Sequence, residues 1–259
     1  LATAEANETL EYANLEAFKA NFTRIFAIEP IDLKMPLLAT NIPNNLEEFT
    51  EKAIISNPNI LSSHHSTKSS KAGEYVAKGA LLPQVSFKVQ NGNTSNKSNI
   101  NNDSVTSTLS VNIPILSKGG VEYSDIRRAK YQTRKTVLLL DAQIKKVRSN
   151  CKATWETFAA AKTRVSATLQ GVKSAEIAYE GVIQEEMLGS KTIVDVQTFE
   201  ERLNKARQTK VEAQKELVLQ SYKIKSLMGE LTAEKMKLPV EYFNPDSEFK
   251  KLKLRIVGF

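Results

Sequence analysis

The feature that most constrains this chain is a long stretch without proline, from about Val121 to Leu188. Glycine occurs within it only at Gly171 and Gly181, so few residues there oppose a continuous helix. A helix over this stretch would be a rod of roughly 100 Å. Such a rod has no core of its own, so it must bury its apolar residues against other helices.

The apolar residues of this stretch repeat every seven positions. Two interleaved series carry the repeat: Val137, Ile144, Cys151, Phe158, Val165, Val172 and Tyr179, and Leu140, Val147, Thr154, Ala161, Thr168, Ala175 and Val182. This heptad spacing predicts supercoiled packing against a neighbouring helix. A second stripe of small residues also repeats every seven: Ala153, Ala160, Ala167, Ser174 and Gly181. Two stripes would let one helix pack on both sides, as a curved wall of helices requires.

The stretch EEMLGSKTIVDV, Glu185 to Val196, interrupts the pattern at Gly189 and Ser190. The heptad then resumes in a return helix that we expect to end at the C-cap Gly229, with apolar positions at Val196, Phe199, Leu203, Ala206, Ala213, Leu217, Ile224 and Leu227. The sequence therefore predicts a long helical hairpin. Any helical hairpin needs such a turn, so the glycine alone indicates no function.

Ahead of the rod the period changes from helical to alternating. Apolar residues alternate with polar ones on both sides of the polar tract NGNTSNKSNINND, which predicts a β-hairpin. One face of this hairpin could pack on a soluble core. Alternatively the two segments are membrane strands, which need roughly 9–11 residues each with apolar side chains outward. Alternation alone does not decide between these interpretations.

The N-terminal part reads as a helix over residues 1–26, followed by a linker with Pro30, Pro36 and Pro43. The first residues, LATAEANETLEYANLEAF, resemble the middle of a helix rather than a signal peptide. No run of 18 apolar residues exists, so no transmembrane helix is predicted.

Charge and reactive residues indicate no enzyme and no nucleic-acid partner. The net charge is +7, but both signs are mixed along the chain, so anionic lipid or an acidic partner would fit equally well. We find no catalytic set and expect no catalytic residues, no cofactor and no metal. His64 and His65 would point about 100° apart on a helix, which disfavours a shared metal. Cys151 lies among the heptad positions, as a core residue would.

Several stretches together match a known family: NLEEFTEKAIISNPNI after the proline-rich linker, LLPQVSF, NIPILSKGG, and GSKTIVDV before a helix ending in MGEL. In these stretches the chain resembles the C-terminal portion of a TolC-type outer membrane efflux protein (outer membrane factor), over about residues 1–230. The resemblance implies a mainly α fold with a β-hairpin, in which the long coiled-coil-like helices of a periplasmic α-barrel join membrane β-barrel strands.

The same resemblance implies a function and partners. The protein would be the exit duct of a tripartite efflux or type I secretion system, a homotrimer in the outer membrane with its helical part in the periplasm. It would contact outer membrane lipid and act as a passive conduit, docked on a periplasmic adaptor and supplied by an inner-membrane pump. The alternative is a soluble coiled-coil scaffold or interaction protein with no transport role. Arginine at Val111 or Ile113 would discriminate between them, since it should cost roughly 2–4 kcal/mol at a bilayer midplane.

The resemblance also divides the chain into segments. These are residues 1–43 (end of a first-repeat helix and linker), 44–80 (second-repeat helix), 81–118 (membrane β-hairpin with external loop 91–103), 119–230 (long helical hairpin with its tip at 188–191) and 231–259 (C-terminal equatorial segment or tail). The membrane-facing residues would be Val85, Phe87, Val89, Leu109, Val111 and Ile113. Three such chains supply fewer strands than the family's barrel, so we expect either a piece of a longer protomer or the product of a split or decayed gene.

Two functional positions follow from the resemblance. The tip residues Leu188, Gly189, Ser190 and Lys191 would dock on the adaptor. Asp195 matches the first of two carboxylates that form rings around the pore axis and narrow it, while Thr198 replaces the second. Asp195 could instead simply stabilise the N-terminus of the return helix through its dipole.

Overall fold

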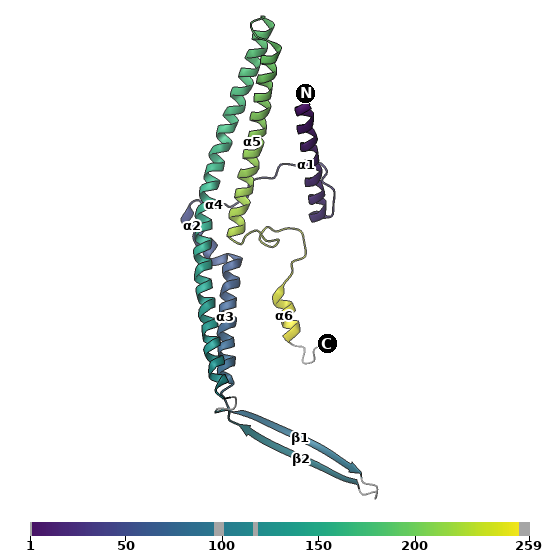
Figure 1. The fold of residues 1–259 in the computed structure, drawn as a ribbon, viewed down its shortest axis with the longest axis vertical. Helices are drawn as coiled ribbons and strands as arrows, with labels where there is room; N and C mark the ends of the chain where they lie inside the picture. The colour runs from purple at the N-terminus through teal and green to yellow at the C-terminus, as the bar shows by residue number, and fades with distance from the viewer. Residues whose placement is uncertain (1, 96–100, 116–118, 254–259) are drawn as a thin grey trace. The chain divides into compact units, whose positions relative to one another are not determined.

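The computed structural model describes residues 2–95, 101–115 and 119–253 (Figure 1). Its elements are α1 (Ala2–Phe26), α2 (Leu46–Ser56), α3 (Pro58–Gly79), β1 (Gln84–Ser95), β2 (Asn101–Asn112), α4 (Val121–Met187), α5 (Ile193–Leu227) and α6 (Pro245–Lys253). The chain divides into two compact units, residues 1–38 and 39–259. Within the described ranges, no helix is both long and apolar enough to cross a membrane. The predicted fold class, helical with one hairpin, is confirmed.

The first unit is α1 with the extended segment that follows it. Several large apolar side chains of α1 are exposed, among them Phe18 at 72% and Leu15 at 48%. Near the C-terminal end of α1 the rings of Phe22 and Phe26 stack with centroids 4.5 Å apart.

In the second unit, α4 packs against α3 along its N-terminal part and against α5 along its C-terminal part (Figure 1). The heptad positions behave as predicted, because from Leu140 to Val182 each of them is buried or half-buried. Val137 is an exception at 44% exposed. The stripe of small residues from Ala153 to Ser174 is exposed, so the packing within this chain does not use it.

The contact between α3 and α4 differs in chemistry from that between α4 and α5. The Thr67 hydroxyl donates to the Thr136 carbonyl oxygen at 3.3 Å, and the Thr133 hydroxyl donates to the Ser70 carbonyl oxygen at 3.1 Å. All three threonines are buried. Because each hydroxyl also bonds within its own helix, buried polar groups here are satisfied without water. Along α5 the matching buried positions are mainly aliphatic.

The core lies where α2, α4 and α5 meet. Its fully buried members are Phe49, Ala53, Val147, Cys151, Ile224 and Met228. Trp155 packs beside it, with its ring 6.2 Å from that of Phe49. The prediction that Cys151 is a core residue is confirmed, and burial raises the pKa of its thiol to about 11.

At the edge of this core, the break between α2 and α3 meets the end of α5. We call this contact the helix junction: Ser56, Asn57, Leu227, Met228 and Gly229. The Ser56 hydroxyl donates to the Met228 carbonyl oxygen at 2.7 Å, and the Asn57 side-chain amide donates to the Leu227 carbonyl oxygen at 2.8 Å. Thus side chains from another segment satisfy carbonyl oxygens that the end of a helix leaves unpaired.

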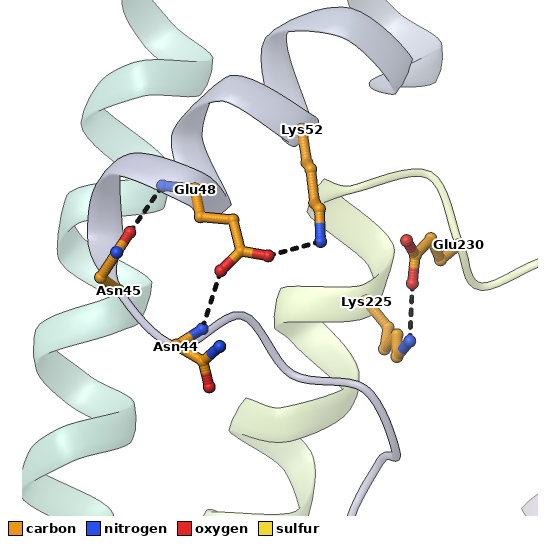
Figure 2. A network of polar contacts seen from close by, with 6 residues as sticks. All are labelled: Asn44, Asn45, Glu48, Lys52, Lys225 and Glu230. Carbon is orange, nitrogen blue, oxygen red and sulfur yellow. Dashed lines mark hydrogen bonds and ion pairs between the residues drawn. The ribbon is translucent and has the colours of Figure 1, made fainter.

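Figure 2 shows the polar network beside the helix junction. The Asn45 side chain caps α2 by accepting from the Glu48 backbone N–H at 2.8 Å. The Glu48 carboxylate accepts from Lys52 at 2.7 Å and from the Asn44 N–H at 3.1 Å. These bonds, that with Lys52 first, lower the pKa of the Glu48 carboxyl. On α5, Lys225 pairs with Glu230 at 2.6 Å.

The β-hairpin is antiparallel, with Gln84 opposite Asn112 and Ser95 opposite Asn101. The strands therefore extend further into the polar tract than the predicted loop 91–103, of which only residues 96–100 lie outside the described ranges. Backbone ladder bonds need no apolar side chain, so alternation underestimates the strand length. β2 also ends before Ile113, and Pro114 lacks the N–H that a ladder needs.

Candidate functional site

The turn at residues 188–191 joins α4 to α5 through a compact hydrogen-bonded cap. Gly189 adopts a left-handed φ of 77°, which its lack of a Cβ permits. The Gly189 N–H donates to the Glu186 carbonyl oxygen at 2.8 Å, and the Ser190 N–H donates to the Glu185 carbonyl oxygen at 2.9 Å. This pair of bonds is the Schellman motif, and the Ser190 hydroxyl adds a third bond to the Glu185 carbonyl oxygen at 2.8 Å.

The tip is apolar as well as exposed. Leu188 is 85% exposed and Met187 is 77% exposed on one side of the turn. On the other side Ile193 and Val194 are 65% and 63% exposed. Large apolar side chains gathered at the end of a long helical hairpin mark a surface suited to a protein partner. The sequence predicted only residues 188–191 as the tip surface. The apolar residues Met187, Ile193 and Val194 were missed, although they directly flank the turn in the sequence.

Asp195 takes part in a capping box at the start of α5. Its Oδ2 accepts from the Thr192 N–H at 2.9 Å and from the Thr192 hydroxyl at 2.8 Å. The Thr192 hydroxyl oxygen in turn accepts from the Asp195 N–H at 3.3 Å. These bonds lower the pKa of Asp195, with the backbone N–H of Thr192 as the largest cause.

The alternative reading of Asp195, support for the helix N-terminus, therefore has a clear structural basis. Both bonds to Thr192 are made by Oδ2, one of the two carboxylate oxygens of Asp195. At the next predicted position, the Thr198 hydroxyl donates to the Val194 carbonyl oxygen at 2.9 Å. Thr198 thus brings no charge to this part of α5.

The β-hairpin has one apolar face and one polar face. Directly opposite residues share a face, and the register pairs Val85 with Val111 and Phe87 with Leu109. Val89 extends this face, and Val105, which sequence reasoning did not single out, lies on it opposite Asn91. Each of these apolar side chains is at least 56% exposed. The other face carries Ser86, Lys88, Ser110 and Thr108.

No group of three or more His, Cys, Asp or Glu side chains that could hold a metal occurs among the described residues. The features that the structure does show are an apolar sheet face, an apolar helical tip and a capped carboxylate beside that tip.

Comparison with known proteins identifies relatives of this arrangement. The family model described as outer membrane efflux protein matches residues 50–230. The outer membrane efflux protein BepC of Brucella suis biovar 1 is 26% identical over 276 aligned residues, which cover all of this chain and 59% of that protein. The chain thus spans less than two thirds of the length of this curated relative.

Solved structures share the fold at low sequence identity. The open state of the MtrE outer membrane channel of Neisseria gonorrhoeae superposes with a TM-score of 0.74 at 14% identity, over 88% of this chain and 53% of that one. The outer membrane protein VceC of Vibrio cholerae gives a TM-score of 0.70 at 15% identity, over 88% of this chain and 56% of that one.

Proposed function

Because this chain belongs to the outer membrane efflux protein family, we propose that it forms part of a passive outer membrane channel through which solutes leave the cell. Its β-hairpin lies in the outer membrane, and its long helices extend into the periplasm. Three protomers assemble around the conduit, and an inner-membrane pump supplies the solute and the energy.

The observation that carries this proposal is the exposed apolar face of the β-hairpin. A water-exposed sheet face made of Val85, Phe87, Val89, Leu109 and Val111 would favour aggregation in water. The same face is what a strand pair presents to lipid, while the serines, threonine and lysine of the other face would line an aqueous interior.

The test compares two arginine substitutions on adjacent residues of β2. Leu109→Arg places a charge on the apolar face, and Thr108→Arg places the same charge on the polar face. Facing lipid near the bilayer centre, Leu109→Arg should cost about 2–4 kcal/mol, whereas Thr108→Arg should cost little. The measurement is the amount of heat-resistant assembly recovered from the outer membrane fraction. Equal recovery of both variants would favour a soluble coiled-coil scaffold instead.

For the tip, we infer docking on a periplasmic adaptor through Leu188, Gly189, Ser190 and Lys191. What supports this is the exposure of the apolar side chains around the turn together with the absence of any side chain on Gly189. A partner helix could approach the backbone there, because an added Cβ on Gly189 would meet nothing within 4 Å in this chain.

Two substitutions separate docking from turn geometry. Gly189→Phe adds bulk, whereas Gly189→Asn tolerates the left-handed conformation with a small side chain. We expect cross-linking to the adaptor to be lost with Phe and largely kept with Asn, while assembly survives in both. Gln170→Phe, at an exposed position of α4 outside both the heptad positions and the stripe of small residues, is the control for bulk alone. Unchanged cross-linking of Gly189→Phe would remove Gly189 from the docking surface.

For Asp195, we propose a single acidic ring at the entrance, with the free carboxylate oxygen directed to the conduit and the other oxygen held by Thr192. Asp195→Asn should then reduce the cation preference of single-channel currents. Thr198→Asp should increase it by adding the second ring. A cation preference that neither variant changes would leave Asp195 with its capping role only.

A further inference from the structure

A second candidate site lies near the start of α4. The segment RRAKYQTRK, Arg127 to Lys135, holds five basic residues and no acidic one. Three of these, Arg127, Lys130 and Arg134, fall at helical spacing and line a cavity of about 370 Å³ together with Tyr131. All four side chains are exposed, Tyr131 at 69%. The spacing of three, four and seven places them on one face of the helix.

The three cations of this face are largely uncompensated. No ion pair joins Arg127, Lys130 or Arg134 to a carboxylate among the residues that the structure describes. Arg127 donates to the Ser124 hydroxyl at 3.0 Å. On α3, the pKa of Glu74 is lowered mainly by its hydrogen bond with Lys78 and, to a lesser extent, by the charge of Lys130. That carboxylate is already paired with Lys78 at 2.8 Å.

The position of this cavity suggests its ligand. The segment that follows the β-hairpin ends at Gly120, the N-cap of α4. Arg127 lies seven residues later, about 10 Å along the helix. Helical Cα–Cβ bonds tilt toward the N-terminus, so the side chains at 127, 130 and 134 lean toward the hairpin. Tyrosine beside arginine and lysine at the end of a membrane segment is the usual composition of a membrane–water interface.

We propose that Arg127, Lys130, Tyr131 and Arg134 bind the phosphate of an anionic phospholipid in the periplasmic leaflet of the outer membrane. This inference rests on the proposed membrane position of the β-hairpin. Guanidinium groups suit a phosphate because they offer paired donors, and Tyr131 supplies an apolar ring beside the glycerol part of the lipid. The site would hold the base of α4 against the membrane surface.

The test uses vesicle flotation of the full 259-residue chain. Vesicles of phosphatidylcholine alone are compared with vesicles in which about a third of the lipid is phosphatidylglycerol. The difference in binding between the two measures the attraction of the basic side chains to an anionic surface. The variant Arg127→Gln/Lys130→Gln/Arg134→Gln removes the charges of the cavity. The matched control, Arg128→Gln/Lys135→Gln/Lys146→Gln, removes three charges from another exposed face of the same helix.

With each cation contributing about fivefold near an anionic surface, the cavity variant, which lacks three cations, should lose its preference for phosphatidylglycerol by about 100-fold. The control should lose clearly less, about threefold, as expected for long-range attraction alone. Equal losses in both variants would overturn the site in favour of nonspecific charge. Competition by millimolar inorganic phosphate would overturn the lipid assignment in favour of a free phosphate site.

Failure of the proposed function gives a different result. If the hairpin of the unmodified chain stayed open to protease with both kinds of vesicle, the membrane assignment would fall, and this inference with it. If the hairpin were protected in both but the cavity variant kept its lipid preference, only the headgroup site would fall.

Discussion

Two glycine turns in this molecule have the same pattern of backbone hydrogen bonds, but one is open to solvent and the other is packed against a neighbouring segment. At the tip, Gly189 has φ 77°, and after α5, Gly229 has φ 63°. The Gly229 turn repeats the Schellman bonds, with the Gly229 N–H donating to Ser226 at 3.0 Å and the Glu230 N–H to Lys225 at 2.9 Å. A Cβ on Gly189 would meet nothing within 4 Å, whereas one on Gly229 would overlap the Ser56 carbonyl oxygen. One turn is held by its own backbone, the other also by a neighbouring segment.

The largest expected effect is that of Gly229→Ala. The left-handed conformation and the overlap with Ser56 should together reduce the free energy of unfolding by about 3 kcal/mol. Gly189→Ala meets only the conformational cost, about 1 kcal/mol of local stability at the tip, so it should hardly change the global unfolding midpoint. Urea unfolding followed by the fluorescence of Trp155, the only tryptophan in the chain and a neighbour of the core, measures the global midpoint of each variant. Equal unfolding midpoints for the two variants would show that the contact at Gly229 adds no constraint.

The next effect concerns Asn57, which is 2% exposed. Asn57→Ala removes its bond to Leu227 and also its cap of α3, where Oδ1 accepts from the Asn59 N–H at 3.0 Å. We expect a loss of about 2–3 kcal/mol, because the carbonyl oxygen of the half-buried Leu227 is left unpaired as well. Asn45→Ala, the exposed cap of α2, is the control and should cost about 1 kcal/mol. A smaller loss for Asn57→Ala than for Asn45→Ala would contradict the importance of the helix junction.

A smaller, local effect is expected at the tip. Thr192→Ala breaks the capping box and should cost about 1 kcal/mol of local stability. Since the tip is far from the core, the global unfolding midpoint should hardly change. Amide hydrogen exchange at residues 193–196 measures the local opening, and Thr198→Ala, outside the box, is the control. Exchange unaltered in Thr192→Ala would mean that backbone bonds alone hold the turn.

The smallest expected effect is a pH dependence of amide hydrogen exchange at residues 193–196. The folded pKa of Asp195 is lower than its ordinary value, so the tip gains protection above that ordinary value, near pH 4. The protection disappears as the pH falls through the lower folded pKa and the carboxylate is protonated. Asp195→Asn should show no such dependence. A wild-type profile that stays flat below pH 4 would argue against the capping role of the carboxylate.

These comparisons also show what the sequence could predict. The heptads of α4 and α5 specified both helices and the turn, because local periodicity reports which side of a helix is buried. Asn57-Pro58 and Gly229 were recognisable as a helix break and a helix end. Nothing local indicates that these two segments meet, although a hydrogen bond joins Asn57 to Leu227 at a sequence separation of 170. Contacts of that kind depend on tertiary packing.

The threonines between α3 and α4 were missed for a related reason. Thr133 and Thr136 are polar by composition, and a pattern of apolar residues cannot show that their hydroxyls bond carbonyl oxygens of α3 or of their own helix. At the tip, the sequence located the turn and Asp195. The spacing from Thr192 to Asp195 also fits the pattern of a capping box, but only the structure shows that its two reciprocal bonds form. The role of the tip stayed dependent on family resemblance, because a glycine turn has the same local signature with or without a partner.

The geometry of the helix junction affects where the tip of the helical hairpin lies. The 35 residues of α5 extend roughly 50 Å between the junction and the tip. A change of about 1° in the angle of this arm at the junction moves the tip by about 1 Å, by simple proportion to that length. The fit of Gly229 against the Ser56 carbonyl oxygen at the near end is thus one of the contacts that set the position of the far end, together with the packing of α5 on α4.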